Sequence, residues 1–101
     1  MNEHELKARV HEFLSGLRKS GRPVWFLKVH GGPMQRVGVP DYLLIVNGKA
    51  AALELKHPQE RNPTPTVAQD RELFWIRHAG GNTLLSNNLE QTKAWIWSLL
   101  A

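Results

Sequence analysis

Hydrophobic and polar positions follow the periods of helices and strands along the chain. Between Glu3 and Lys19 the apolar residues recur every three or four positions, which predicts an amphipathic helix with one buried stripe. The stripe contains Leu6, Val10, Phe13, Leu14 and Leu17. Turn-forming residues at 20–23 end this helix. Residues 24–29 are β-branched, aromatic and aliphatic, and predict a strand.

The middle of the chain has the pattern of a β-hairpin. Residues 30–40 contain three glycines and two prolines and predict a long loop, which is often functional. Residues 41–46 and 49–56 predict two strands. Asn47 and Gly48 between them are typical of a two-residue hairpin turn.

The last third of the chain predicts a helix, a strand and a second helix. Residues 57–65 form a polar loop, and Thr64 with Pro65 is expected to start a helix that runs to about His78. Residues 82–86 predict a short strand. Asn87 or Asn88 is expected to cap a final helix that ends near residue 100. The order α-β-β-β-α-β-α predicts an α/β fold.

Composition narrows the class of protein. The 101 residues suffice for one domain, expected to span residues 1–101, and 42% hydrophobic with 22% charged residues is an ordinary globular balance. No apolar run approaches the roughly 20 residues that span a membrane, and the N-terminus lacks the apolar segment of a signal peptide. The absence of cysteine excludes disulfides and thiolate metal sites and is compatible with a cytoplasmic location.

Net charge indicates a class of partner. Lysine and arginine total 13 against 9 acidic residues, a net charge of +4. A basic surplus favours a polyanionic partner through counterion release. The charge alone is equally compatible with a basic domain that never binds nucleic acid.

The predicted hairpin brings two acids together. A two-residue turn at 47 and 48 places Asp41 opposite Glu54, with Cβ atoms about 4.5–5.5 Å apart. Lys56 points to the same face. Two close carboxylates repel, and a divalent cation such as Mg²⁺, with the carbonyl of Leu55 as a further ligand, would relieve the repulsion. The simpler alternative is a cross-strand salt bridge between Lys56 and either acid.

A third acid is expected at the same end of the sheet. Glu3 shares the buried stripe of the first helix with Leu6 and Val10, so packing of that helix on the sheet would bring Glu3 to the acidic pair. Glu5, near the edge of the stripe, is the alternative. Either residue could instead only complement the helix dipole.

A glutamine is also expected to point at the sheet. Gln69 shares a helical face with Leu73 and Ile76, and a buried amide needs hydrogen-bond partners. Lys56 or a substrate phosphate would serve. Alternatively, backbone groups at the helix start satisfy the amide.

Several basic residues are candidates to bind phosphates. They are Lys28, Arg36, Arg61 and Arg71, together with the loop backbone at Gly38. Each side chain could equally be a solvated surface charge. The five histidines lack the spacing of a metal site.

Two tryptophans near the C-terminus bear on oligomeric state. Trp95 and Trp97 are two positions apart and cannot share one helical face. One is expected to pack on the core and the other to be exposed or covered by a second subunit, since aromatic residues are enriched at interfaces. Alternatively, both cover a small core.

The combined motifs resemble a known family. Pro40-Asp41 followed across a hairpin by Glu54-Leu55-Lys56 is similar to the PD-(D/E)XK nuclease superfamily. More narrowly, the chain resembles the VRR-NUC domain over about residues 3–86, in its helix-1 glutamate, its Arg-Val-Gly-Val-Pro-Asp loop at 36–41 and its inward Gln69. The resemblance implies a restriction-endonuclease-like mixed sheet with an αβββαβ core, here followed by an extra C-terminal helix.

The resemblance also implies an activity. It implies DNA cleavage that depends on Mg²⁺ or Mn²⁺, with Asp41, Glu54 and Glu3 as metal ligands, Lys56 orienting or activating the attacking water, and Gln69 bracing Lys56 or the phosphate. Stand-alone members are similar to Holliday-junction resolvases and tend to be homodimers, which implies a branched DNA substrate. Two alternatives remain open: a non-catalytic DNA-binding module, and a nuclease subunit active only with a partner.

Overall fold

The computed structural model describes all residues 1–101 and contains three helices and one four-stranded sheet. The elements are α1 (Glu3–Lys19), β1 (Val24–Lys28), β2 (Tyr42–Val46), β3 (Lys49–Leu55), α2 (Val67–His78), β4 (Asn82–Ser86) and α3 (Leu89–Leu100). The strand order is β1-β2-β3-β4; the first three strands are antiparallel and β4 is parallel to β3. This is the predicted α/β fold with a mixed sheet.

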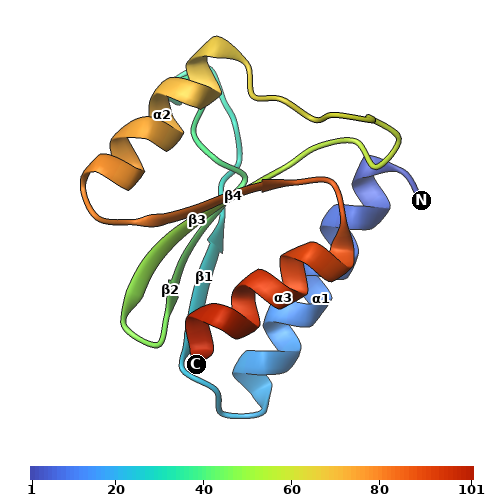
Figure 1. Cartoon of the computed structure of the whole chain (residues 1–101), viewed down its shortest axis with the longest axis vertical. Coiled ribbons are helices and arrows are strands. Elements are labelled where there is room, and N and C mark those ends of the chain that lie inside the picture. The colour runs from blue at the N-terminus through green and yellow to red at the C-terminus, as the bar shows by residue number, and fades with distance from the viewer.

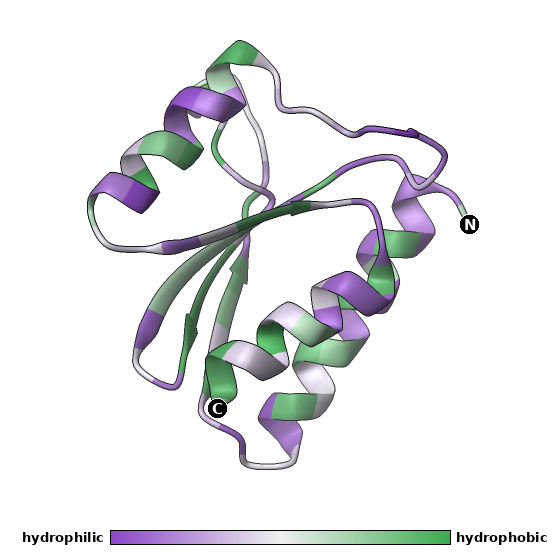
Figure 2. Cartoon of the chain, in the orientation of Figure 1, coloured by the Kyte–Doolittle hydropathy of each residue, from purple (hydrophilic) through white to green (hydrophobic).

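The helices cover the sheet from both sides. In Figure 1, α1 and α3 lie side by side against one face of the sheet, and α2 lies on the other. Tyr42, Leu44 and Val46 of β2 are buried in the core shared with α1 and α3. Because side chains alternate along a strand, Leu43 and Ile45 point to the α2 side. Figure 2 shows the strands as mainly hydrophobic, whereas hydrophobic and hydrophilic residues alternate along the helices.

Only part of the second sheet face is covered. Leu73 is the one buried residue of α2, and the helix packs against β3 and β4. Trp25, Leu27 and Ile45 of β1 and β2 are each about half exposed. The α2 side of the sheet therefore has a much smaller hydrophobic contact than the α1 and α3 side.

The prediction for the start of α2 was wrong. Thr66, and not Thr64, is the N-cap, and the helix begins at Val67. The Thr66 hydroxyl accepts from the Gln69 N–H at 3.1 Å, and Gln69 Oε1 accepts from the Thr66 N–H at 2.9 Å. This reciprocal capping box satisfies two backbone donors, which outweighs the preference of proline for the first helical position.

The C-terminal helix separates its two tryptophans. Asn88 caps α3, one of the two predicted residues. Trp95 packs against the hydrophobic core, whereas Trp97 is 43% exposed and contacts Phe13 with ring centroids 6.2 Å apart. None of the three helices combines the length and apolar character needed to cross a membrane.

Candidate active site

The β2–β3 hairpin positions the two acids. Its register pairs Val46 with Lys49 and Tyr42 with Leu53, which confirms the register predicted from the turn. Asp41 directly precedes β2, and its backbone N–H donates to Glu54 Oε1 at 3.1 Å. In return, the Leu55 N–H donates to Asp41 Oδ2 at 2.8 Å. Each carboxylate is thus fixed by the backbone of the opposite strand.

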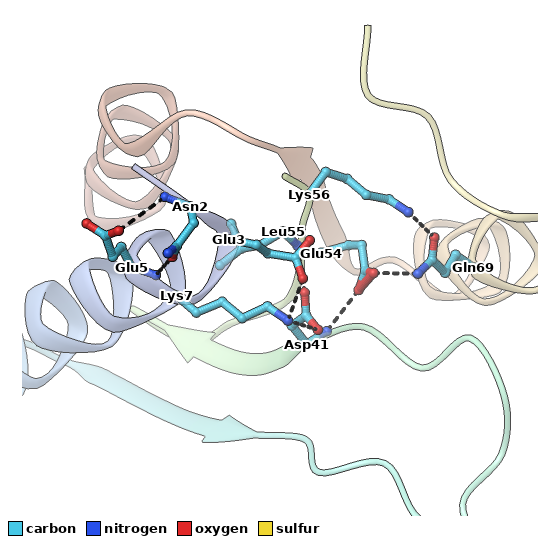
Figure 3. A network of polar contacts seen from close by, with 9 residues as sticks. All are labelled: Asn2, Glu3, Glu5, Lys7, Asp41, Glu54, Leu55, Lys56 and Gln69. Atoms are coloured by element: carbon cyan, nitrogen blue, oxygen red, sulfur yellow. Dashed lines mark hydrogen bonds and ion pairs between the residues drawn. The ribbon is translucent and has the colours of Figure 1, made fainter. Parts of the chain in front are cut away.

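Gln69 of α2 connects the buried acid with the lysine. Its Nε2 donates to Glu54 Oε2 at 2.6 Å, and its Oε1 accepts from Lys56 Nζ at 2.7 Å (Figure 3). The inward orientation predicted for Gln69 is confirmed. The alternative of a simple cross-strand salt bridge is not observed. Lys56 forms no ion pair with Asp41 or Glu54.

Burial and the neighbouring Asp41 disfavour a negative charge on Glu54. Glu54 is only 4% exposed. Burial, and then the neighbouring charge of Asp41, raise the pKa of Glu54 to about 7, although the Asp41 N–H and the charges of Lys56 and Lys7 act in the opposite direction. The pair therefore favours an added cation over two free negative charges.

Lys7 is a site residue that the sequence analysis missed. Its ammonium lies 3.6 Å from Asp41 Oδ1 and 3.5 Å from Glu3 Oε2, between the two acids (Figure 3). The available signal was its position four residues after Glu3, on the same helical face. Lys7 thus occupies the approach of Glu3 to Asp41.

The alternative acid, Glu5, has a structural contact instead. Glu5 forms a capping box with Asn2 at the start of α1 and points away from Asp41 (Figure 3). Of the two acids considered for this helix, Glu3 is the one beside the site. No group of three acidic or histidine side chains is close enough to hold a metal ion in this arrangement.

The glycine-rich loop forms one wall of a hollow at the carboxylates. The hollow measures about 310 Å³, and its lining includes Gly31, Gly32, Arg36, Gly38, Asp41, Glu54 and Gln69. Gly38 has φ +89°, and a Cβ there would lie 2.5 Å from the carbonyl carbon and oxygen of Ala68. Only glycine allows the loop to approach the start of α2 this closely.

The predicted phosphate-binding side chains lie in different environments. Arg36 forms an ion pair with Glu72 of α2 at 2.7 Å, which ties the loop to that helix. Arg61 and Arg71 are exposed. Lys28, at the end of β1, lines a separate hollow beside Lys7. Gly38 and Arg36 therefore line the hollow at the acids, whereas Lys28, Arg61 and Arg71 do not.

Comparisons with known proteins identify the fold. No protein-family model and no curated protein matches the chain by sequence. Among solved structures, one described as a "VRR_NUC domain" superposes with a TM-score of 0.71 over 94% of each chain, at 23% sequence identity. An identity this low is informative about fold only. With its three helices, mixed sheet and paired acids at the hairpin, this chain has the fold of a VRR_NUC domain.

Proposed function

We propose that this protein is a metal-dependent endonuclease that hydrolyses phosphodiester bonds in DNA. The supporting observation is the arrangement of Asp41 and Glu54 at the hairpin, with Gln69 bonded to both Glu54 and Lys56, on the fold of a VRR_NUC domain. A buried acid held beside a second acid is costly to stability, and such groups gather where chemistry needs them.

The donor set fits a hard divalent cation. Asp41 and Glu54 offer carboxylate oxygens, which Mg²⁺ and Mn²⁺ prefer. Burial beside Asp41 raises the pKa of Glu54, so an added positive charge would favour its ionised form. The Leu55 carbonyl and Glu3 are the further proposed ligands, and Lys7 must move for Glu3 to join. A bound ion would polarise the scissile phosphate and lower the pKa of a water molecule.

The remaining polar residues have roles in positioning and charge. Lys56 supplies a positive charge that stabilises the negative charge developing on the phosphate. Gln69 holds the Lys56 ammonium at 2.7 Å and so fixes its place relative to Glu54. The loop around Gly38 presents backbone groups and Arg36 to the DNA strand.

We further propose that a homodimer acts on branched DNA. A symmetric dimer presents two equivalent sites, which suits a junction with two equivalent strands. Trp25, Leu27 and Ile45, which are each about half exposed on the α2 side of the sheet, support an additional contact. Sedimentation analysis is expected to give twice the mass of the chain, and a monomer at working concentrations would contradict this part of the proposal.

Cleavage of a DNA panel tests the activity. Four-way junctions, flaps, nicked and plain duplexes are incubated with the protein, with and without Mn²⁺. We expect metal-dependent cleavage of branched substrates and a loss of about 100-fold or more for Lys56→Ala. Lys19→Ala, at the far end of α1, is the matched control and should cleave normally. If wild-type protein binds every DNA and cuts none, the proposal is wrong for this chain by itself, which is then a DNA-binding module or a subunit that needs a partner.

A further inference from the structure

A second hollow lies next to the carboxylates, between α1 and β1. It measures about 290 Å³ and is lined by His4, Lys7, Ala8, His11, Lys28 and Tyr42. No acidic side chain lines it, and five of the six residues can donate a hydrogen bond. Its composition is therefore the opposite of the acidic pair beside it.

The sequence gathers these side chains on one surface. His4, Lys7 and His11 are three and seven positions apart, so they share one side of α1. Lys28 pairs with Tyr42 across β1 and β2, so both point to the face that α1 covers. The hollow thus lies between one side of α1 and the end of β1.

Part of its lining is held in place, and the charge of Lys28 is not neutralised, whereas Lys7 is paired with Glu3 and Asp41. His11 Nδ1 lies 3.1 Å from the Tyr42 hydroxyl, and the His11 ring packs edge-on against Phe26 with centroids 5.3 Å apart. Lys28 and His4 take part in no ion pair. An anion entering the hollow would meet the unpaired ammonium of Lys28, together with the side chains of His4 and His11.

The hollow adjoins the candidate active site through Lys7. The Lys7 side chain lines the hollow, and its ammonium lies 3.6 Å from Asp41 Oδ1. An anion in the hollow would therefore lie beside whatever group Asp41 and Glu54 act on. In a nucleic acid, the anion next to one phosphate on a strand is another phosphate.

We propose that this hollow binds the backbone phosphate that neighbours the scissile phosphate on the same DNA strand, with Lys28, His4 and His11 as its contacts. This inference rests on the proposed nuclease function. Phosphate contacts fix the position of the duplex without reading sequence. The hollow would thus set which phosphodiester bond of the strand reaches the acids.

Salt dependence of DNA binding provides the first test. Binding of a four-way junction to the full chain is measured in EDTA, so that no cleavage occurs, at several salt concentrations. Lys28→Gln should reduce the magnitude of the slope of log affinity against log salt concentration by about one, because one phosphate contact is lost. Lys19→Gln removes the same charge from an exposed position and should leave the slope unchanged. Equal slopes for the two variants would overturn the inference.

A neutral phosphate locates the contact. Single methylphosphonates are placed along one strand, and binding is compared for wild type and Lys28→Gln. At one position, the methylphosphonate should weaken DNA binding by the wild type and leave DNA binding by Lys28→Gln unchanged, as in a double-mutant cycle. In cleavage assays with Mn²⁺ this position should adjoin the cut. A coupled position remote from the cut, or none, would refute the hollow as the neighbouring-phosphate site.

The two proposals fail in different ways. A protein that cuts no DNA but shows the Lys28 coupling loses the nuclease function and keeps this phosphate site. A protein that cuts DNA normally while Lys28→Gln and Lys19→Gln behave alike keeps the function and loses the site. Thermal melting of both variants checks folding, and both exposed substitutions should leave the melting temperature within about 3 °C of wild type.

Discussion

Glu54 is buried beside a charged neighbour, and this makes the stability of the folded protein depend on pH. In the folded protein its pKa is raised to about 7, against an ordinary value of 4.5. Between these pH values the folded state keeps a proton that the unfolded state has lost. Stability therefore falls as pH rises through this window, by on the order of 3 kcal/mol from this residue.

Urea unfolding in EDTA from pH 4.5 to 8 measures this fall. Asp41→Asn should reduce the fall without abolishing it, because it removes the charge of the neighbour and leaves the burial of Glu54. Added Mn²⁺ should stabilise the protein most above pH 7, where Glu54 is already ionised. Equal falls for wild type and Asp41→Asn would show that Asp41 does not act on Glu54.

Gly38 provides a second prediction for a single residue. Gly38→Ala would place a methyl group 2.5 Å from the Ala68 backbone at a positive φ, where neither neighbour is a flexible side chain. We expect a loss of about 2–4 kcal/mol in the free energy of unfolding. Gly32→Ala, in the same loop with nothing within 4 Å, is the control and should be nearly neutral. Equal losses for both variants in chemical denaturation would contradict the close approach.

Single residues also show what the sequence could reveal about the site. The period of two in the hairpin placed Asp41 beside Glu54, and helical spacing turned Gln69 inward, because both effects are local geometry. Lys7 was missed because its contact with Asp41 depends on how α1 lies over the end of the sheet. That placement is set by tertiary packing, whereas the spacing of Lys7 from Glu3 gives only the helical face on which Lys7 lies.

At the level of elements, the first turn of α2 has two separable functions. Thr66 closes the capping box, whereas Gln69 both closes it and contacts Glu54 and Lys56. Thr66→Ala should cost about 1 kcal/mol of stability and leave most DNA cleavage intact. Gln69→Ala should have a similar cost and lower cleavage at least tenfold, through the freed Lys56.

Denaturation and cleavage rates measured on both variants separate these functions. If Thr66→Ala reduces cleavage as much as Gln69→Ala, the two residues act only by holding the helix. If neither reduces cleavage, Gln69 does not position Lys56.

The elements themselves were largely predictable, because strong periodicity and turn residues fixed them. α1 has the predicted bounds, and β1 and β2 differ by one residue at an end. The prediction of the start of α2 was wrong because two threonines can each cap the helix. Which of them does so depends on the glutamine three positions after Thr66. The pairing of β4 with β3 could not be read from its five residues, since nothing local selects a parallel partner.

At the scale of the whole molecule, the two sides of the sheet differ in stability. α1 buries Leu6, Val10, Leu14 and Leu17 in the main core, whereas α2 buries only Leu73, which lies outside that core. Regions with few buried apolar contacts open locally below the global unfolding free energy. We therefore expect α2, which carries Gln69, to open before α1.

Native-state hydrogen exchange tests this order. Amides of α2 should exchange at lower free energy than those of α1. Leu73→Ala should lower protection in α2 while sparing α1, whereas Leu99→Ala, in the core that α3 shares with α1, should lower protection throughout by about 2–5 kcal/mol.

If Leu73→Ala lowers α1 protection as much as Leu99→Ala, the molecule unfolds as one unit, and Gln69 is then held as firmly as the core. If α2 does open separately, the link from Glu54 to Lys56 is broken in that open state, and cleavage should fall in proportion to its population.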